Sequence, residues 1–377
     1  MKKIGILGGT FNPVHIEHVE LVINAKAELC LDQVFVMPTY ISPHKTTLPA
    51  PAEDRVKMLK LAFKGIDGVT VSEYEIEKRG KSYTYQTVEY FKALYPDAEI
   101  YFICGGDMLT DFKNWKYPER ILKCARLAVF GREDFFTDYQ KESEYFKENF
   151  NSDFVKLNYI GKEFSSTRIR VNASLGLPLN GQTPKCVEEY IRTNRLYSGD
   201  EYTAFVKKTL TEKRLVHTAS VVNCALQKAK ELGLDSQKVY ISALLHDCAK
   251  YIDYNTVKGF NLDDDVPAPV VHAFLGAFIA ERTLKITDQD ILNAIRYHTS
   301  GRPRMSTLEK LIFTADMVEE GRTYQGVEKL RELYKSDFEK GFIECLKEEV
   351  LHLTNKGQNI YRLTLDAYDY YVKDKGE

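Results

Sequence analysis

Two histidines, His15 and His18, stand three residues apart shortly after a glycine pair, Gly8-Gly9. Glycines that follow the first strand of an α/β sheet let a phosphate approach the backbone. Histidines at this spacing face one side of the first turn of a helix, near its positive end, where imidazoles can donate hydrogen bonds to an anion. The segment therefore predicts a phosphate site, with ordinary core or surface histidines as the alternative.

A second candidate for phosphate binding lies about 150 residues later, where Ser165-Ser166-Thr167 precedes an apolar helix. A serine hydroxyl can cap the helix while the free backbone amides receive phosphate oxygens. Arg168 and Arg170 would add charge-assisted hydrogen bonds. The alternative is a plain capped helix without a ligand.

The second half of the chain carries residue types that bind metals. The adjacent pair His246-Asp247 follows the apolar residues 243–245, and burying such groups without compensation costs several kcal/mol as an order of magnitude. A metal ion removes that cost, and imidazole with carboxylate suits iron, manganese or zinc. The candidate ligands are His217, His246, Asp247, His272, His298 and Asp316.

The elements that position the first two motifs alternate between strand and helix. Such alternation predicts an α/β, Rossmann-like domain with a parallel sheet and helices on both faces. Residues 133–153, rich in charge, are expected to form a surface excursion. We expect strands over 3–7, 34–37, 69–76, 100–103 and 127–130, and helices over 18–30, 54–63, 85–94 and 121–124.

Strand patterns nearly vanish after residue 197, and helical patterns replace them. A change from alternating elements to helices alone indicates a domain boundary, which we expect near Ser198-Gly199, with domains over 1–197 and 198–377. The second domain should therefore be all-α. Its expected helices span 202–210, 215–232, 239–249, 271–283, 288–297, 308–318 and much of 327–371.

Composition agrees with a two-domain globular protein. The chain has 377 residues, 44% of them hydrophobic and 28% charged, and domains average roughly 150 residues. Lys and Arg number 52 against 54 Asp and Glu, which gives no reason to expect nucleic-acid or membrane binding. No apolar stretch suits a signal peptide or a spanning helix, and the seven scattered cysteines form no CxxC pair. We expect a cytoplasmic protein with reduced thiols.

The first half resembles a known superfamily. Gly8 to His18 resembles the HxGH signature of nucleotidyltransferases, and Phe164 to Arg170 resembles their ISSTxIR signature. Within that superfamily the chain is most similar to bacterial nicotinate-nucleotide adenylyltransferases. The residues that carry this finer resemblance are Pro43-His44-Lys45, Ser82-Tyr83-Thr84, Gly105-Gly106-Asp107, Trp115 and Arg132. The resemblance implies that nicotinate mononucleotide and ATP condense to deamido-NAD and pyrophosphate.

The resemblance also implies roles for residues. The mononucleotide phosphate would attack the ATP α-phosphorus directly, so that catalysis is positioning plus charge stabilisation. His15 and His18 would hold phosphates, while Lys45 and Arg170 neutralise charge and Mg²⁺ bridges the leaving pyrophosphate. Trp115 would stack on the nicotinate ring, and Asp107 would meet the ribose or the metal. The implied nucleotide-binding set is Gly8, Gly9, Thr10, Phe11, Thr84, Gly106, Asp107, Trp115, Arg132, Ser165, Ser166, Thr167 and Arg168.

Two positions depart from the family pattern. Asn12 replaces an aspartate, which is a mild change, and Glu17 replaces the glycine of HxGH. A carboxylate beside a triphosphate is repulsive, and glycine allows close approach. We therefore expect Glu17→Gly to raise turnover or to lower the Mg²⁺ requirement. If Glu17 disables the site, the first half could instead bind nucleotide and regulate the second.

The order His, His-Asp, Asp in the second half resembles the HD phosphohydrolase superfamily. That resemblance implies one ion on His217, His246 and Asp316, a second ion on His272 and His298, and Asp247 as the bridge. The stretches 246–250, 272–276 and 294–299 are similar to symmetrical diadenosine-tetraphosphate (Ap4A) hydrolases. This implies cleavage of Ap4A to two ADP, with iron as the expected metal. Lys250, and Arg302 or Arg304, could contact the polyphosphate.

We therefore expect a bifunctional enzyme whose partners are ATP, nicotinate mononucleotide and Ap4A. The sequence leaves a homo-oligomer open. It also leaves open another phosphate ester as the substrate of the second half, because the same metal set serves several substrates.

Overall fold

The computed structural model describes residues 1–373 apart from 42–49, 134, 163, 180 and 264. The described chain divides into two compact units. The first comprises Met1–Ala173 and Pro178–Tyr197, and the second comprises Ser174–Leu177 and Ser198–Glu377. Helix α8 (Ser166–Leu175) begins in the first unit and ends in the second.

The first unit is built on a parallel sheet of six described strands in the order β3-β2-β1-β4-β5-β6. This confirms the predicted Rossmann-like sheet. The strand order reverses between β1 and β4, and ligands of such folds bind beyond the carboxyl ends of the strands at that point. The strands are β1 (Lys3–Gly9), β2 (Gln33–Pro38), β3 (Val69–Val71), β4 (Glu99–Gly105), β5 (Arg126–Arg132) and β6 (Phe154–Gly161).

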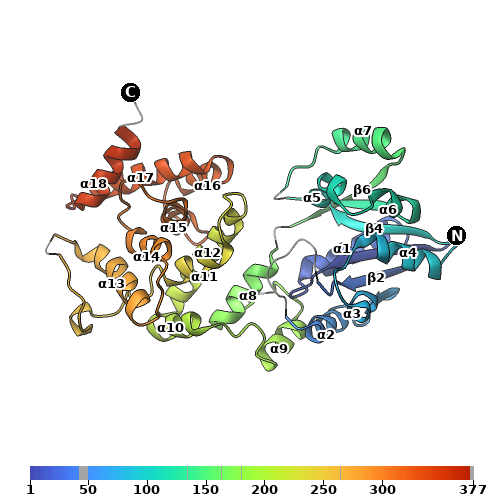
Figure 1. Ribbon diagram of the computed structural model, residues 1–377, viewed down its shortest axis with the longest axis horizontal. Coiled ribbons are helices and arrows are strands. Elements are labelled where there is room, and N and C mark those ends of the chain that lie inside the picture. The colour runs from blue at the N-terminus through green and yellow to red at the C-terminus, as the bar shows by residue number, and fades with distance from the viewer. Residues whose placement is uncertain (42–49, 134, 163, 180, 264, 374–377) are drawn as a thin grey trace. The chain divides into compact units, whose positions relative to one another are not determined.

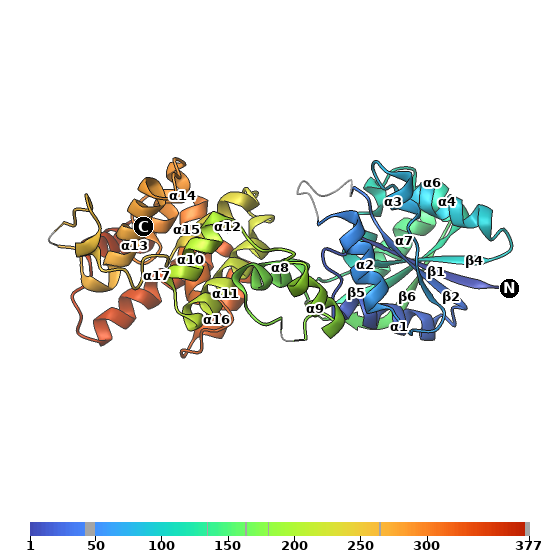
Figure 2. The same cartoon turned by 90° about the horizontal axis from the view of Figure 1, so that it is seen from below.

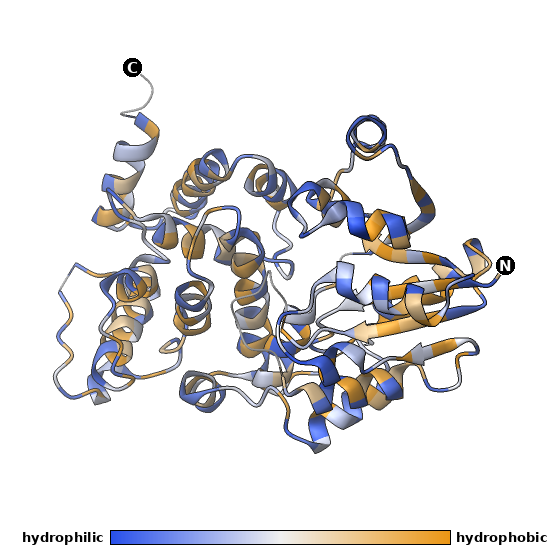
Figure 3. Cartoon of the chain, turned by 45° about the vertical axis from the view of Figure 1, so that its right-hand side comes forward, coloured by the Kyte–Doolittle hydropathy of each residue, from blue (hydrophilic) through white to orange (hydrophobic). Residues whose placement is uncertain are grey.

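Helices cover both faces of this sheet, because its strands are apolar on both sides. Figure 3 shows most of the sheet in the apolar colours. Neighbouring residues of β1 enter different cores: Leu7 packs in the core with α1 and α2, and Ile6 packs in the opposite core with α4 and α7. The helices of the unit are α1 (Ile16–Glu28), α2 (Ala52–Ala62), α3 (Tyr74–Lys78), α4 (Thr84–Leu94), α5 (Gly106–Thr110), α6 (Pro118–Cys124), α7 (Tyr139–Phe150) and α9 (Lys185–Thr193) (Figures 1 and 2).

Two expectations for this unit were wrong. The strand expected over 69–76 ends at Val71, and residues 74–76 belong to α3, because Tyr74 stacks on Tyr90 and Glu75 is buried against Thr87. The stretch 133–153 is not a plain excursion: α7 buries Phe146 completely. It leads into β6, an edge strand that escaped prediction because few of its residues are buried.

The second unit is helical, as predicted. Several of its helices begin at an Asp, Ser or Thr whose side chain accepts a backbone N–H, for example Thr211, Asp288 and Ser306. Helix α12 packs against α11, α14 and α15. The helices are α10 (Glu201–Thr209), α11 (Glu212–Ala229), α12 (Ser236–Leu245), α13 (Ala268–Arg282), α14 (Gln289–Tyr297), α15 (Thr307–Val318), α16 (Val327–Ser336), α17 (Phe338–Asn355) and α18 (Arg362–Tyr368). Within the described ranges, no helix has both the length and the apolar character to cross a bilayer.

Candidate active sites

The carboxyl end of β1 leads directly into the histidine pair. His15 precedes α1 and His18 lies in its first turn, so that their rings stack with centroids 3.6 Å apart. The backbone N–H of His15 donates to Nδ1 of His18 over 3.1 Å. Because an N–H can only donate, Nδ1 of His18 is the acceptor nitrogen, and the neutral ring carries its proton on Nε2. That proton is a donor suited to an anion.

Gly9, the second residue of the glycine pair, is required for packing. Phe11 has a positive φ of 48° and packs edge-on against His18, with ring centroids 4.9 Å apart. A Cβ on Gly9 would lie only 2.9 Å from the Phe11 ring. Any side chain at Gly9 would therefore displace Phe11, which supports His18.

His15 is a neutral group in this setting. Burial, helped by the charge of Arg132, lowers the pKa of His15 to about 3. Its Nδ1 is buried and makes no hydrogen bond within the described ranges. His15 can thus serve as a hydrogen-bonding group for a ligand, and it supplies no positive charge near neutral pH.

The second motif is joined to the first by hydrogen bonds. Ser166 Oγ donates to the carbonyl of Pro13 over 2.9 Å, and Arg170 Nη1 donates to the carbonyl of Asn12 over 2.9 Å. Ser165 Oγ accepts the N–H of Thr167 over 3.2 Å, as a helix cap does. The start of α8 therefore lies beside the turn that leads to His15.

The neighbouring strand ends contribute further predicted residues. Asp107, in α5 after β4, lies 3.6 Å from Arg132 at the end of β5. Trp115 packs against Phe112, at a centroid distance of 5.2 Å, and lines a cavity of about 210 Å³. Thr84, at the start of α4, lines the same cavity. Its described lining is Ser82, Tyr83, Thr84, Asn114, Trp115, Lys116 and Ile121.

One predicted catalytic residue, Lys45, lies outside the described residues, as does His44. A buried arginine that the sequence analysis missed, Arg55, fastens the chain on either side of that stretch. Its guanidinium donates to the carbonyls of Thr10 (2.9 Å), Thr39 (2.7 Å) and Ala50 (3.0 Å). Burial lowers the pKa of Arg55. The sequence feature that could have indicated this role is an arginine beside the apolar residues of α2.

The two departures from the family pattern have definite partners. Asn12 Oδ1 accepts the N–H of Ala50 over 3.0 Å and the hydroxyl of Tyr197 over 2.8 Å. An amide oxygen serves here as well as a carboxylate does. Glu17 Oε2 accepts the Tyr159 hydroxyl over 2.6 Å and the N–H of Lys162 over 2.9 Å. The Glu17 carboxylate is therefore hydrogen-bonded to β6 and to the residue after it.

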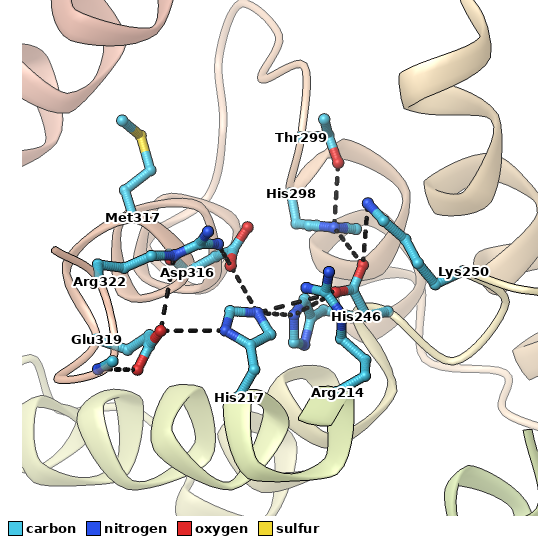
Figure 4. A network of polar contacts seen from close by, with 12 residues as sticks. Arg214, His217, His246, Lys250, His298, Thr299, Asp316, Met317, Glu319 and Arg322 are labelled. Atoms are coloured by element: carbon cyan, nitrogen blue, oxygen red, sulfur yellow. Dashed lines mark hydrogen bonds and ion pairs between the residues drawn. The ribbon is translucent and has the colours of Figure 1, made fainter. Parts of the chain in front are cut away.

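In the second unit, the six predicted metal ligands converge from five helices or from the residues directly after them. Figure 4 shows four of them, His217, His246, His298 and Asp316. His217 lies on α11, and His272 lies on α13. His246 and Asp247 directly follow α12, and His298 directly follows α14. Asp316 lies on α15. Helix packing thus brings together residues that are up to 99 positions apart in sequence, from His217 to Asp316.

One half of this cluster surrounds His217. Its Nε2 lies 2.9 Å from Asp316 Oδ1 and 3.4 Å from His246 Nε2. Asp247 Oδ2 faces the same half, at 3.4 Å from His246 Nε2. His217, His246 and Asp316 each offer one atom within 4.8 Å of the others. This spacing suits a single ion.

The other half surrounds His272 and His298. Asp247 Oδ1 lies 3.0 Å from His272 Nε2 and 3.7 Å from His298 Nε2. The two imidazole nitrogens are themselves 3.3 Å apart. The two oxygens of Asp247 therefore face different histidine pairs, which is the arrangement a carboxylate needs in order to bridge two ions.

Backbone carbonyls orient two of the histidines. His246 Nδ1 lies 2.7 Å from the carbonyl of Ala243, and His298 Nδ1 lies 2.7 Å from the carbonyl of Ile295. A carbonyl only accepts, so each Nδ1 carries the proton. Each Nε2 then presents its lone pair toward Asp247, as a metal ligand must.

The pKa shifts of His272, His246 and Asp247 suit metal binding. His217 differs: burial would lower its pKa, but the bonds to Asp316 and Glu319 outweigh burial and raise it. Burial lowers the pKa of His272 to about 4 and lowers the pKa of His246. Burial alone would raise the pKa of Asp247, but the surrounding imidazoles, His246 foremost, outweigh it and hold that pKa well below its usual range. Neutral imidazoles and an ionised carboxylate are the forms that bind a metal.

A buried oxygen in the cluster supplies a direct test of metal fit. Asp247 is 2% exposed, and although its Oδ1 lies close to His272 Nε2, it makes no hydrogen bond within the described ranges. An ionised oxygen left in this state is costly. A divalent transition metal would satisfy it, and imidazole nitrogens with carboxylate oxygens suit such an ion.

Three cations face the carboxylate ligands. Arg214 Nη1 lies 2.8 Å from Asp247 Oδ2, Arg322 Nη2 lies 2.5 Å from Asp316 Oδ1, and Lys250 Nζ lies 3.6 Å from Asp247 Oδ1. The sequence analysis named Lys250 but missed both arginines. Arg214, one helical turn before His217, carried a usable signal.

Arg302, in contrast, pairs with the buried Glu309, to which Nη2 donates over 2.8 Å. Glu309 is also the third helical residue in the cap of α15. Arg302 therefore supports the start of α15, and its contact with substrate stays a prediction.

Glu319 is a further residue that the sequence analysis missed. Its Oε1 lies 3.1 Å from His217 Nδ1, and its Oε2 accepts the N–H of Gly321 over 2.6 Å. Burial would raise the pKa of Glu319, but the bonds to His217 and Gly321 outweigh it and lower that pKa. The ionised carboxylate orients the His217 ring toward Asp316 (Figure 4).

Comparison with known proteins follows the division into two units. A family model described as cytidylyltransferase-like matches residues 6–172, and a model described as HD domain matches residues 214–321. A Mycoplasma genitalium protein, "Probable nicotinate-nucleotide adenylyltransferase/Ap4A hydrolase", is 28% identical over 360 residues, which are 92% of this chain and 97% of that protein.

Two further relatives each match one half of the chain. The Bacillus subtilis protein "Bis(5'-nucleosyl)-tetraphosphatase, symmetrical" is 38% identical over 180 residues, 46% of this chain and 97% of its own length. A Clostridium botulinum protein, "Probable nicotinate-nucleotide adenylyltransferase", is 37% identical over 199 residues, 52% of this chain and 98% of its own length.

Proposed function

The chain belongs to the nicotinate-nucleotide adenylyltransferases through its first half and to the HD-domain symmetrical tetraphosphatases through its second, and from that premise we propose that it carries out both reactions. The first makes deamido-NAD and pyrophosphate from ATP and nicotinate mononucleotide. The second splits Ap4A into two ADP. The domains over 1–197 and 198–377 would each hold one of these sites.

In the first reaction, the mononucleotide phosphate attacks the α-phosphorus of ATP, one P–O bond forms, and the bond to pyrophosphate breaks. The protein contributes position and charge. His18 would donate from Nε2 to phosphate oxygens, and the start of α8 would offer backbone amides to them. Arg170, which is bonded to the carbonyl of Asn12, would balance the negative charge of the phosphates. Mg²⁺ would supply charge stabilisation to the leaving pyrophosphate. Trp115 and Thr84 would receive the nicotinate ring in their cavity.

The observation that carries this assignment is the joining of the two motifs by Ser166 and Arg170 at the turn before His15. The test is to incubate the full-length protein with ATP and nicotinate mononucleotide over a range of Mg²⁺ concentrations and to measure deamido-NAD. His18→Ala should lower this turnover by orders of magnitude while Ap4A hydrolysis continues. Absence of product from the wild type at every Mg²⁺ level would refute the assignment, and equal rates with the amide mononucleotide would point to another branch of the superfamily.

In the second reaction, a hydroxide oxygen bonds to a β-phosphorus of Ap4A and the bond to the central bridging oxygen breaks, so that two ADP leave. When bound, two divalent metal ions would supply a hydroxide at neutral pH and would stabilise phosphate charge. Asp247 would bridge these ions, with the four histidines and Asp316 completing their ligands. Arg214, Lys250 and Arg322 would bind phosphate oxygens.

The division of the two Asp247 oxygens between different histidine pairs carries this second assignment. The test is product analysis after incubation with Ap4A, together with metal analysis of the purified protein. Symmetrical cleavage gives ADP as the only primary product. AMP together with ATP would refute it, and a protein with one ion per chain under metal-replete conditions would refute the two-metal site.

Several finer points belong to the same proposal. Iron is the expected metal of the second site, since imidazole nitrogens with carboxylate oxygens suit it. Both reactions would take place in the cytoplasm, where the seven free thiols remain reduced. A homo-oligomer would be recognised by light scattering of the purified protein.

A further inference from the structure

Glu17 occupies a critical position between the two histidines of the first site. It lies in the first turn of α1, immediately before His18 in sequence. Its Oε2 accepts the hydroxyl of Tyr159 over 2.6 Å and the N–H of Lys162 over 2.9 Å. Burial, and then the bond to Glu17, raise the pKa of Tyr159, so the hydroxyl stays protonated and donates.

These bonds connect the two halves of the nucleotide site. Tyr159 lies on β6, and Lys162 follows that strand on the way to Ser165 and α8. Elsewhere, the same two segments are joined by Ser166 to the Pro13 carbonyl and by Arg170 to the Asn12 carbonyl. Glu17 thus provides a third connection, on the α1 side of the histidine pair. A glycine at this position has no side chain with which to make it.

We propose that Glu17 is a positioning residue for adenylyl transfer: it binds the start of α1 to the segment after β6 and thereby sets His18 against the start of α8. The inference rests on the proposed adenylyltransferase function. The sequence led us to expect that the Glu17 carboxylate repels ATP. The proposal reverses this expectation, because the carboxylate accepts the Tyr159 hydroxyl and the Lys162 N–H, which would otherwise lose their partner.

The chain supplies a matched control at the other end of the same helix. Glu28 accepts the N–H of Asn158 over 2.9 and 3.0 Å and the Asn158 side-chain amide over 2.9 Å. Both glutamates therefore fasten α1 to β6 through a backbone N–H and a side chain. Ten positions of helix, about 15 Å at 1.5 Å per residue, separate Glu28 from His18. The two residues share the fastening role and differ in their distance from the site.

The experiment compares Glu17→Gly, Glu17→Gln, Glu28→Gly and Glu28→Gln in the full-length protein, with kcat and KM for ATP measured through deamido-NAD formation. Glu17→Gly should lower kcat about tenfold or more, since small misplacements of reacting groups have effects of that size. Glu17→Gln should stay within about threefold of the wild type, because its amide oxygen can accept both donors. Both Glu28 variants should keep the wild-type kcat, although Glu28→Gly should lower the melting temperature.

The repulsion hypothesis predicts different results. If the charge of Glu17 hinders ATP, Glu17→Gly and Glu17→Gln should both raise turnover or lower the Mg²⁺ requirement, and either result would overturn the proposal. Equal kcat losses in Glu17→Gly and Glu28→Gly would also overturn it, because they would indicate general destabilisation.

A second measurement keeps the inference separate from the proposed function. Amide hydrogen exchange at Lys162 should accelerate in Glu17→Gly and stay unchanged in Glu28→Gly, and calorimetric affinity for ATP should fall only in the former. If the wild type makes no deamido-NAD, the function is refuted, while exchange and ATP affinity still decide the role of Glu17. Unchanged exchange at Lys162 in Glu17→Gly would refute that role whatever the reaction.

Discussion

Replacing Glu319 by glutamine should weaken metal binding at the half of the cluster that holds His217. Glu319 is 3% exposed, and its Oε1 lies 3.1 Å from His217 Nδ1. His246 and His298 have neutral carbonyls as their Nδ1 partners, at 2.7 Å each. Only His217, among these three, has a carboxylate in this role. A negative charge behind the ring makes Nε2 a better donor to a metal.

The size of the effect follows from what glutamine keeps and loses. Its amide oxygen can still accept the His217 proton, but its NH2 group then faces the N–H of Gly321, which loses its acceptor, and the negative charge is gone. Loss of such a partner typically lowers metal affinity 10- to 100-fold, which is about 1.4–2.7 kcal/mol. Arg322 Nε lies 3.7 Å from Glu319 Oε1 and already balances part of the charge. We therefore expect a loss near tenfold.

The assay is metal content after equilibration against a series of chelator concentrations. Glu319→Gln should release one ion per chain at a chelator concentration about tenfold lower than the wild type requires, and it should retain the other ion. Glu320→Gln is the control, because its carboxylate is exposed and accepts the Ser220 hydroxyl at 3.5 Å. An affinity for Glu319→Gln within twofold of the wild type, or equal to that of Glu320→Gln, would refute the reasoning.

Further predictions test both units. Asp247→Ala should lose both ions, because its two oxygens face different histidine pairs, whereas His298→Ala should keep one; metal analysis distinguishes them. His15→Gln should reduce the acid sensitivity of the first unit. Burial lowers the pKa of His15 to about 3, whereas the unfolded chain has the ordinary value of 6.5. As the pH falls from 6.5 toward 3, the free energy of unfolding of the wild type therefore decreases by about 1.4 kcal/mol per pH unit. The variant lacks this contribution. Fluorescence of Trp115, the only tryptophan, follows that unfolding. Arg55→Met should destabilise the first unit by about 3 kcal/mol, since three carbonyls lose their donor, and should leave Ap4A hydrolysis intact; an unchanged Trp115 unfolding transition would contradict this.

The central strands and the glycines at the carboxyl end of β1 were predictable, because the sequence signal for both is local. Strand β1 is a continuous apolar run that ends in glycines, and burial on both faces requires such a run. Strand β6 was not predictable on this basis. It pairs only with β5, and residues Leu157 and Gly161 alone are buried along it. An edge strand has a neighbouring strand on one side alone, so fewer of its side chains are buried and its sequence resembles that of a loop.

Partners of charged residues were harder to predict than the residues themselves. The six predicted metal ligands stand out because histidine and aspartate next to apolar residues are unusual. Glu319 and Arg322 follow Asp316 in a charged stretch that resembles an ordinary solvated helix end. Only the bend of the chain after α15 brings Glu319 back to His217. Likewise, the sequence did not indicate that Arg302 pairs with Glu309.

The two sites use one residue type for opposite purposes, and helix polarity explains how. At the start of α1, unpaired N–H groups point outward, and the N–H of His15 donates to Nδ1 of His18, which puts the His18 proton on Nε2 and makes the ring a donor to anions. At the ends of α12 and α14, unpaired carbonyls accept from Nδ1 of His246 and His298, which leaves a lone pair on each Nε2 for a cation. In our proposal, the helix start thereby prepares His18 for phosphate, and the helix ends prepare His246 and His298 for metal, whereas His217 and His272 lie within their helices. For these three histidines, the position relative to the helix therefore carries chemical information beyond the residue type.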